Sequence, residues 1–358
     1  MATTADQRLF ELTASNEDPT QTKTIRQTYA RRLRGAFGRI NAAIREAVVK
    51  DDIFGLRSED LSDDEVDELL DTFADARHEL HAVDKPPDLS TLPPAERVAQ
   101  FEAWLEDVQE SEVLEVIDRG ENIWIRRAYE RGIKHADTSL RQAGAAITQQ
   151  EATDVLQMPI HERRLQVLFA RNYSELTGIT NAVSQQISRE LSSGLAEGVS
   201  PSEIGRRISD RISKIGKTRA TTLARTEVMY SHSEATLTRY EQQGVEKVGI
   251  EPEFRLQTAG DLSVCDQCEA AAGEGPWSLE DLRGSGFQPP LHPNCRCTIL
   301  PVVNEAAEEA IARHPAEFVA IFEAGGFASN GLYYEALAEA DGDRARELTA
   351  QAVSPAAG

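Results

Sequence analysis

The segment VCDQCEAAAGEGPWSLEDLRGSGFQPPLHPNCRCTI, residues 264–299, holds all four cysteines of a 358-residue chain. Cys265 and Cys268 form a C-x-x-C pair, and farther along His292 precedes Cys295 and Cys297. A two-residue gap suits a tight turn that points both sulfurs to one place, and alternate residues of a strand share one face. Thiolate and imidazole are ligands that four-coordinate Zn²⁺ prefers. The spacing predicts a zinc site that uses four of the five residues, either all four cysteines or three cysteines and the histidine.

The loop between the two pairs is rich in glycine and proline and has few apolar side chains. A core of its own would not offset the entropy of ordering it, so we expect the cysteines to fasten it. Three alternatives to zinc stay open. One or two disulfides would persist in an oxidising setting. A redox-active thiol pair would need the strand-to-helix setting of thioredoxin-like sites, which this C-x-x-C lacks. The thiols could also be buried without a special role.

Upstream of this segment the sequence predicts helices. Apolar residues recur at helical spacing in 24–49 and again in 161–198. We expect the arginines of 24–49 on a solvated face, with contact to phosphate or to an acidic partner as the alternative. An acidic start predicts a helix over 61–80. The proline-rich stretch 84–94 interrupts the pattern, and one or two helices follow over 95–136.

Stop and start signals follow the helix over 161–198. Gly198 ends that helix, Ser200 is placed as an N-cap, Pro201 fits the first helical position and Glu203 completes a capping box. The helical pattern then continues to Gly244.

Beyond Gly244 the pattern changes. Residues 245–258 have an interrupted β-like pattern, 297–303 are predicted as a strand, and a helical tail begins at 305. The predicted fold is mainly α, with long helices and a small C-terminal α+β module stapled by the Cys/His cluster. We expect four regions: a helical N-terminal region (1–150), a central helical part (151–244), the small Cys/His module (245–303) and a helical tail (304–358).

The composition is strongly acidic. The net charge is −22, and only seven of the 38 basic residues are lysines. High salt favours such a surface because it screens self-repulsion, which predicts a halophilic source; an ordinary acidic protein is the alternative. The sequence has no apolar run of membrane-spanning length and no basic, then apolar, signal peptide. The total charge argues against nucleic-acid binding over the whole surface.

A local reversal of charge lies within 205–225, where Asp210 is the single acidic residue. It could contact nucleic-acid phosphates or an acidic partner protein. The candidate contact residues are Arg206, Arg207, Arg211, Lys214, Lys217 and Arg219.

Within the helix that ends at Gly244, Arg225, His232 and Arg239 recur every seven residues. This stripe could bind an anion, but a polar face, or a core arginine paired with Glu227, is the simpler interpretation. Glu227 needs a basic partner if it is buried, because a lone buried carboxylate is costly.

The run Ala224-Arg225-Thr226-Glu227, the C-x-x-C pair and the H-P-x-C-R-C stretch together resemble the phage Mu F-like minor head protein family of tailed viruses. The similarity covers roughly residues 160–303. It implies a minor capsid protein in a few copies per virion, inside the head at or near the portal vertex. Its role would be head assembly, genome packaging or delivery, with host cytoplasm as the site of assembly. The prediction of a zinc site depends on the spacing of the cysteines and the histidine, not on the resemblance.

The resemblance also implies partners: the portal protein, the major capsid protein or both, with packaged double-stranded DNA as a further candidate and no membrane. Residues 1–150 are the candidate for docking on the portal or capsid. We expect no enzyme and no catalytic residue, since no phosphate loop, G-x-S-x-G or H-E-x-x-H motif occurs. Two alternatives remain, a DNA-binding internal virion protein and a metal-dependent hydrolase at the Cys/His site. A four-ligand, thiolate-rich zinc site leaves no position for water, which disfavours the hydrolase.

Overall fold

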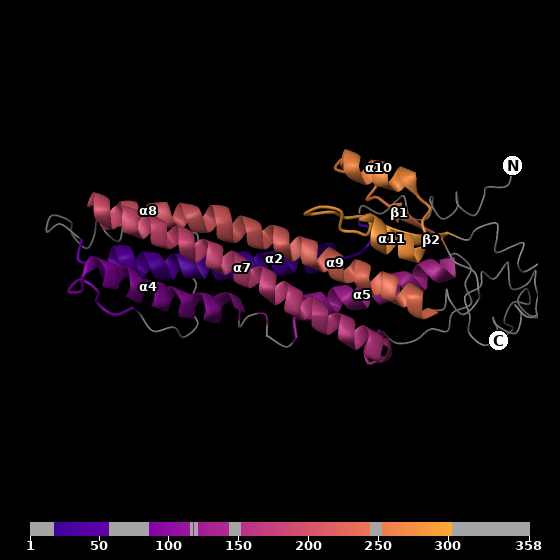
Figure 1. Cartoon of the computed structure of the whole chain (residues 1–358), viewed down its shortest axis with the longest axis horizontal. Coiled ribbons are helices and arrows are strands. Elements are labelled where there is room, and N and C mark those ends of the chain that lie inside the picture. The colour runs from indigo at the N-terminus through magenta and orange to yellow at the C-terminus, as the bar shows by residue number, and fades with distance from the viewer. Residues whose placement is uncertain are drawn as a thin grey trace, which may run out of the picture. The chain divides into compact units, whose positions relative to one another are not determined.

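Long helices make up most of the chain that the computed structural model describes, namely residues 18–56, 86–114, 117, 121–142, 152–243 and 253–302 (Figure 1). Two short strands and a Cys/His cluster complete the small C-terminal module, so the predicted fold class is confirmed. The helix expected over 61–80, Gly244 and the tail after 303 lie outside the described residues. Within the described part, no helix is both long enough and apolar enough to cross a membrane.

The elements follow one another with few interruptions. The helices are α2 (Lys23–Arg45), α4 (Pro94–Gln109), α5 (Ile123–Gln142), α6 (Ala152–Leu156), α7 (Pro159–Glu197), α8 (Pro201–Arg211), α9 (Thr218–Gln243), α10 (Asp266–Glu274) and α11 (Leu279–Ser285). Short π-helical segments are η1 (Glu46–Lys50), η2 (Glu110–Leu114) and η4 (Ile212–Lys217). Strands β1 (Glu253–Gln257) and β2 (Thr298–Val302) pair antiparallel, with Arg255 opposite Leu300.

The chain divides into two compact units, each built from separate segments. Unit 1 comprises Met1–Lys23, Arg126–Leu165 and Val228–Gly358, and unit 2 comprises Thr24–Ile125 and Gln166–Glu227. The four consecutive regions expected from the sequence remain a prediction.

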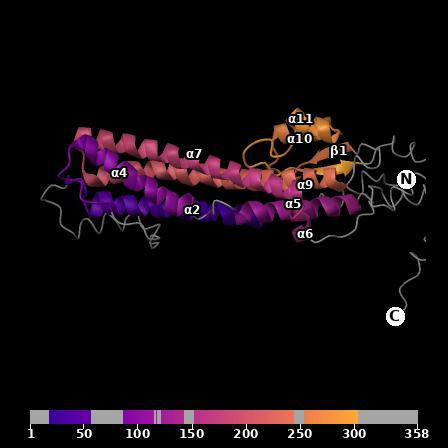
Figure 2. The same cartoon turned by 60° about the horizontal axis from the view of Figure 1, so that its bottom comes forward.

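In unit 2, α2 and α4 lie side by side (Figures 1 and 2). The apolar stripe of α2 is buried as predicted, including Leu33, Phe37 and Ile40. Its arginines do not form one solvated face, however. Arg31, Arg32 and Arg34 are exposed, whereas Arg26, Arg39 and Arg45 are buried. Arg39 forms an ion pair with Glu112 of η2, whose side chain is fully buried, and this pairing explains how a charged residue is tolerated in the core.

The predicted stop and restart between α7 and α8 is confirmed. Gly198 has a φ of +68°, a left-handed conformation that glycine adopts at low cost after the last helical residue. The Ser200 hydroxyl accepts a hydrogen bond from the Glu203 backbone N–H at 3.3 Å, and Pro201 is the first residue of α8. The Glu203 carboxylate accepts hydrogen bonds from Arg206 and Arg207.

A buried polar network joins three segments of unit 2. The Tyr29 hydroxyl donates to Asn172 Oδ1 of α7 at 2.7 Å, and Asn122 Nδ2 donates to both residues at 3.1 and 3.0 Å. Asn122 Oδ1 also accepts from the backbone N–H groups of Trp124 and Ile125 at the start of α5. One side chain therefore caps a helix and completes the network.

In unit 1, α5 and α9 approach closely at Gly132, where an added Cβ would lie 2.3 Å from the carbonyl oxygen of His232. The small module contacts these helices through its strands and through Arg283 of α11, which pairs with Glu241 of α9 at 2.7 Å. Tyr240 of α9 stacks on Phe254 of β1, with ring centroids 5.1 Å apart, and its hydroxyl donates to the Ile299 carbonyl. On α5, His135 Nε2 lies 3.0 Å from the Thr298 hydroxyl.

Candidate metal centre

The first pair of cysteines lies at the start of α10. Cys265 occupies the N-cap position with extended backbone angles, φ −92° and ψ 158°, and Cys268 is the third helical residue. The backbone N–H groups of Cys268 and Glu269 donate to the Cys265 carbonyl at 2.9 and 3.0 Å. Side chains at the N-cap and third helical positions face each other, as they do in a capping box. The helix start therefore brings both sulfurs together.

The second half of the cluster is a β-turn over residues 292–295. The Cys295 N–H donates to the His292 carbonyl at 3.1 Å, and Asn294 has a φ of +65°. Proline at the second position and asparagine with positive φ at the third are the signature of a type II turn. The turn places His292 and Cys295 at its two ends, close in space.

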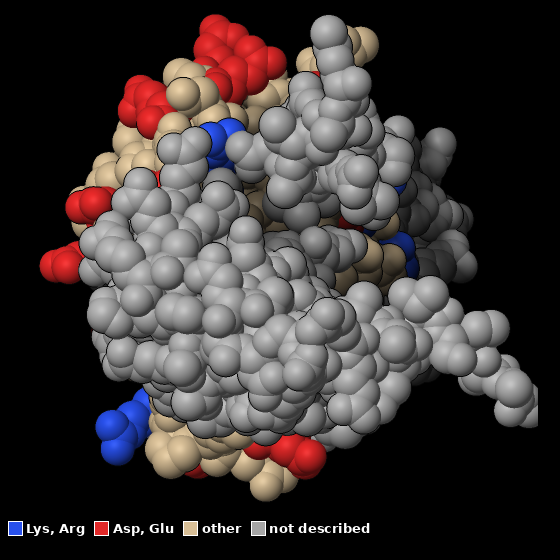
Figure 3. All heavy atoms as spheres, turned by 90° about the vertical axis from the view of Figure 1, so that its right-hand side faces the viewer, with Lys and Arg blue, Asp and Glu red and all other residues tan. Residues whose placement is uncertain are grey.

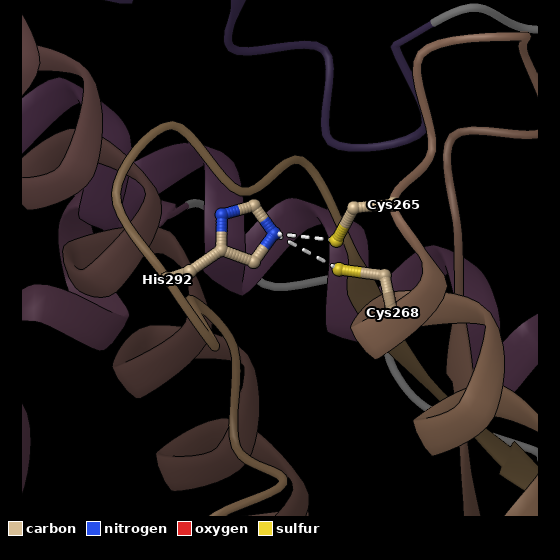
Figure 4. Close-up of side chains that lie close together, drawn as sticks. All are labelled: Cys265, Cys268 and His292. Atoms are coloured by element: carbon tan, nitrogen blue, oxygen red, sulfur yellow. Dashed lines mark hydrogen bonds between the residues drawn. The ribbon is translucent and has the colours of Figure 1, made fainter.

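The donor atoms of the five predicted residues form two overlapping groups. In the first, the sulfurs of Cys265 and Cys268 each lie 3.2 Å from His292 Nε2 (Figure 4). In the second, Cys268, Cys295 and Cys297 gather, with 3.9 Å between the Cys268 and Cys295 sulfurs. All donors within each group lie within 4.8 Å of one another, and Cys268 belongs to both. Tetrahedral zinc with Zn–S of ~2.3 Å and Zn–N of ~2.05 Å separates its ligand atoms by about 3.6–3.8 Å. The spacing within each group of three is near that of neighbouring ligands of one metal ion, and Cys268 is common to both groups.

The His292 ring is held in an orientation that suits a ligand. Its Nδ1 lies 2.9 Å from the Pro293 carbonyl. A carbonyl only accepts hydrogen bonds, so Nδ1 carries the proton and the Nε2 lone pair is directed at the sulfurs. Metal-binding histidines are commonly fixed in this way by a carbonyl or carboxylate on the second ring nitrogen.

The surroundings of the cluster shift the pKa values of its thiols in different directions. A hydrogen bond from the Cys297 side chain lowers the pKa of the Cys295 thiol to about 5. Burial raises the pKa of the Cys268 thiol to about 12. The pKa values of these two thiols are thus shifted in opposite directions. Cysteines bind a metal ion as thiolates, so binding of a cation would release protons from thiols that are still protonated. The four cysteines are free thiols in the structure.

The loop between the pairs has more structure than its composition predicted. Ser278 caps α11 by accepting from the Asp281 N–H at 3.0 Å, and Gly286 ends that helix with a φ of +80°. Trp277 exchanges backbone hydrogen bonds with Phe254 at 2.7 and 2.9 Å and stacks on Phe287. A small apolar cluster thus packs around the buried sulfurs.

Arg296 lies between Cys295 and Cys297 in the sequence, but its side chain forms an ion pair with a residue outside the cluster. Its guanidinium makes a two-pronged ion pair with Asp261, at 2.5 and 2.6 Å, which lowers the pKa of that carboxyl to about 2. Strand β2 begins at Thr298, one residue later than predicted, but Cys295 and Cys297 still share the cluster.

The surface of the module is acidic on the side of α10. In the view of Figure 3, carboxylates outnumber basic groups at the top of the described surface, where Figure 1 places α10. This helix carries Asp266, Glu269 and Glu274 and no basic residue. Carboxylates at such a surface repel phosphate groups.

The six predicted basic contact residues fall into two groups. Arg206, Arg207 and Arg211 form ion pairs with neighbouring carboxylates, at N–O distances of 2.7–3.0 Å to Glu203, Glu197 and Glu190. For Lys214, Lys217 and Arg219, the described part of the chain shows no ion pair. Half of the predicted positive charge is therefore offset locally, and contact with phosphate or a partner remains a prediction.

The residues of the predicted stripe on α9 do not share one environment. Arg225 is exposed, whereas His232 and Arg239 are buried. Arg239 is a core arginine, as one interpretation held, but its partner is Asp137 of α5, at 2.7 Å, and not Glu227. Glu227 is buried as well, and Arg171 of α7 supplies its basic partner at 3.2 Å. Burial raises the pKa of the Glu227 carboxyl, and Arg171 opposes that shift.

Comparison with known proteins supports the resemblance in one part of the chain. Residues 185–300 match the sequence model of the family described as Phage Mu protein F like protein, which is about one third of the 358 residues. The matched region begins within α7 and ends within β2, so it includes Glu227 and all five candidate ligands. No curated protein and no solved structure matched the chain.

Proposed function

We propose that this chain is a structural protein of a tailed-virus head, in which one zinc ion holds the module of residues 253–302 together. The family match over residues 185–300 carries this proposal, because it covers both the A-R-T-E run on α9 and the whole Cys/His cluster. In this view the module is a rigid docking element and has no catalytic role.

The zinc ligands we assign are Cys265, Cys268, His292 and Cys295. Each of the two turns supplies a pair of residues three apart, C-x-x-C and H-x-x-C, and Cys268 already lies near donors of both. Cys297 then remains outside the ligand set as a neighbouring buried thiol. Four protein ligands fill a tetrahedral zinc and leave no position for water, so the site would be structural rather than hydrolytic.

The finer assignment is a minor capsid protein present in several copies, at or near the portal vertex inside the capsid. Its partners would be the portal protein, the major capsid protein or both, and it would act in head assembly, genome packaging or delivery. The resemblance to the Mu F-like family supports these points. The net charge of −22 supports a halophilic host, and a melting temperature that does not rise with KCl concentration would contradict that part.

Protein composition of purified particles tests the head assignment directly. Particles are separated into heads and tails, and the chain is quantified in each fraction by mass spectrometry. The proposal predicts a few copies per head. Absence from heads isolated before and after genome packaging would contradict it.

DNA binding is a second candidate function, supported by Lys214, Lys217 and Arg219, which have no ion pair within the described residues. A gel-shift series across salt concentrations with double-stranded DNA tests it. If these cations neutralise phosphates, replacing all three with glutamine reduces the salt dependence of the affinity in proportion to the number of phosphates that are no longer neutralised. An unchanged salt dependence would exclude these three side chains as the DNA-binding surface.

A further inference from the structure

Unit 2 contains a polar groove of about 630 Å³ between α4–η2 and α7. One wall carries Glu102, Glu106 and Glu110, and the other consists of hydroxyl and amide side chains of α7 from Tyr173 to Ser188. The groove lies away from the Cys/His cluster in sequence, and the proposed function assigns it no role.

The charges of the groove favour a cationic occupant. Among the lining residues that the structure describes, Arg189 is the single basic one against three glutamates. Glu102 and Glu106 are exposed. Residues four apart on a helix are separated by about 6 Å along its axis. Lysine or arginine at every fourth position of a facing helix would match that spacing.

A buried amide that lines the groove indicates that the occupant also supplies a hydrogen-bond acceptor. Gln109 is 4% exposed and lines the groove, and its Oε1 accepts from the Ser184 hydroxyl at 2.8 Å. Its Nε2 has no hydrogen-bond partner in the described part of the chain. A buried donor without an acceptor is costly, so this atom points to an acceptor supplied by an occupant. The adjoining π-helical segment η2 is a feature often found at functional sites.

We propose that this groove docks a cationic helical segment of a partner protein. Basic side chains of that segment pair with Glu102 and Glu106, and a carbonyl or hydroxyl oxygen accepts from Gln109 Nε2. Nucleic acid does not fit, because phosphates would face the glutamates. The proposal depends neither on the metal site nor on the head assignment.

A designed peptide tests the groove on the full-length chain. The probe is a fluorescein-labelled, alanine-rich helical peptide with arginine at every fourth position, and its binding is followed by fluorescence anisotropy at low and at physiological salt. The test variant is Glu102→Gln/Glu106→Gln. The control is Glu96→Gln/Asp107→Asn, which makes the same charge change at exposed positions of the same helix outside the groove. A peptide with glutamate in place of arginine is then paired with Glu102→Arg/Glu106→Arg.

The proposal predicts that the test variant binds the arginine peptide about tenfold more weakly than the wild-type chain, whereas the control variant keeps wild-type affinity. The glutamate peptide should bind the Glu102→Arg/Glu106→Arg variant. The two mixed combinations, glutamate peptide with wild-type chain and arginine peptide with that variant, should not bind. Equal losses in test and control variants, or no binding to the wild-type chain at low salt, would overturn it. Self-association that the test variant abolishes would assign the groove to a second copy of this chain and also overturn the proposal.

Discussion

Replacing Cys268 tests the ligand assignment most sharply, because its sulfur belongs to both donor groups. Structural zinc contributes about 10–16 kcal/mol to the folding of small zinc domains. Divided equally over four ligands, this is about 2.5–4 kcal/mol for each ligand, or on the order of a few hundredfold in zinc affinity. Cys268→Ser should lose that much. Cys297→Ser is the matched control, since its thiol is buried beside the site but lies outside the assigned ligand set.

Competition with a chromophoric chelator gives the zinc affinity of the full-length wild-type and variant chains. Limited proteolysis reports whether the loop of residues 269–291 stays ordered. Cys297→Ser should bind zinc with an affinity close to that of the wild-type chain. Cys268→Ser should bind zinc a few hundredfold more weakly, and the protease should cleave its loop. Wild-type affinity in Cys268→Ser would refute the shared-ligand geometry. Equal losses in the two variants would refute the assigned ligand set, because Cys297 would then be a ligand.

Three further predictions concern the helical units and are measured by chemical or thermal unfolding. Gly132→Ala should destabilise the chain by about 1–3 kcal/mol because its Cβ would overlap the His232 carbonyl. Gly178→Ala, which meets no atom within 4 Å, should stabilise α7 by about 0.5–1 kcal/mol, and equal effects would contradict the helix contact. Glu112→Gln should cost about 3–5 kcal/mol by leaving the buried Arg39 guanidinium without its counter-charge, and a loss below about 1 kcal/mol would show that this charge is solvated. Burial lowers the pKa of His135 to about 4 in the folded chain. As the pH falls, this imidazole is therefore protonated in the unfolded chain at a higher pH than in the folded chain. The unfolding free energy should fall by up to about 3 kcal/mol as the pH drops from about 6.5 to about 4, and His135→Gln should lack this part of the decline.

Much of the fold follows from local signals that depend on neighbouring residues. The cap at Ser200 and the stop at Gly198 are properties of a few consecutive residues, and the structure confirms both. The Cys/His cluster was predictable for the same reason. Each half of it is a turn whose ends are three residues apart, so spacing alone predicts which side chains meet.

Pairings between distant segments were not predictable. Arg39 and Asn172 lie on helices whose outer faces are also polar, so their burial has no local signature. Their partners, Glu112 and Tyr29, are 73 and 143 residues away. Helix α11 was not predicted either, because the glycine-rich composition of residues 269–291 masked its start and stop signals. Ser278 followed three residues later by Asp281, with Gly286 at the end, would have located it.

The groove in unit 2 was not predictable from the sequence for a related reason. Its α7 wall consists of small polar residues that look like an ordinary solvated face, and Gln109 has the character of a surface residue. Only packing reveals that this amide is buried and that its donor lacks an acceptor within the described residues.

The metal content of the purified chain tests the central claim most directly. The chain is isolated without chelator, and its zinc is counted by elemental mass spectrometry alongside a titration of free thiols. One zinc per chain, lost together with the order of the 269–291 loop when a strong chelator is added, is the predicted result. A chain free of zinc, with its cysteines joined as disulfides, would contradict the account.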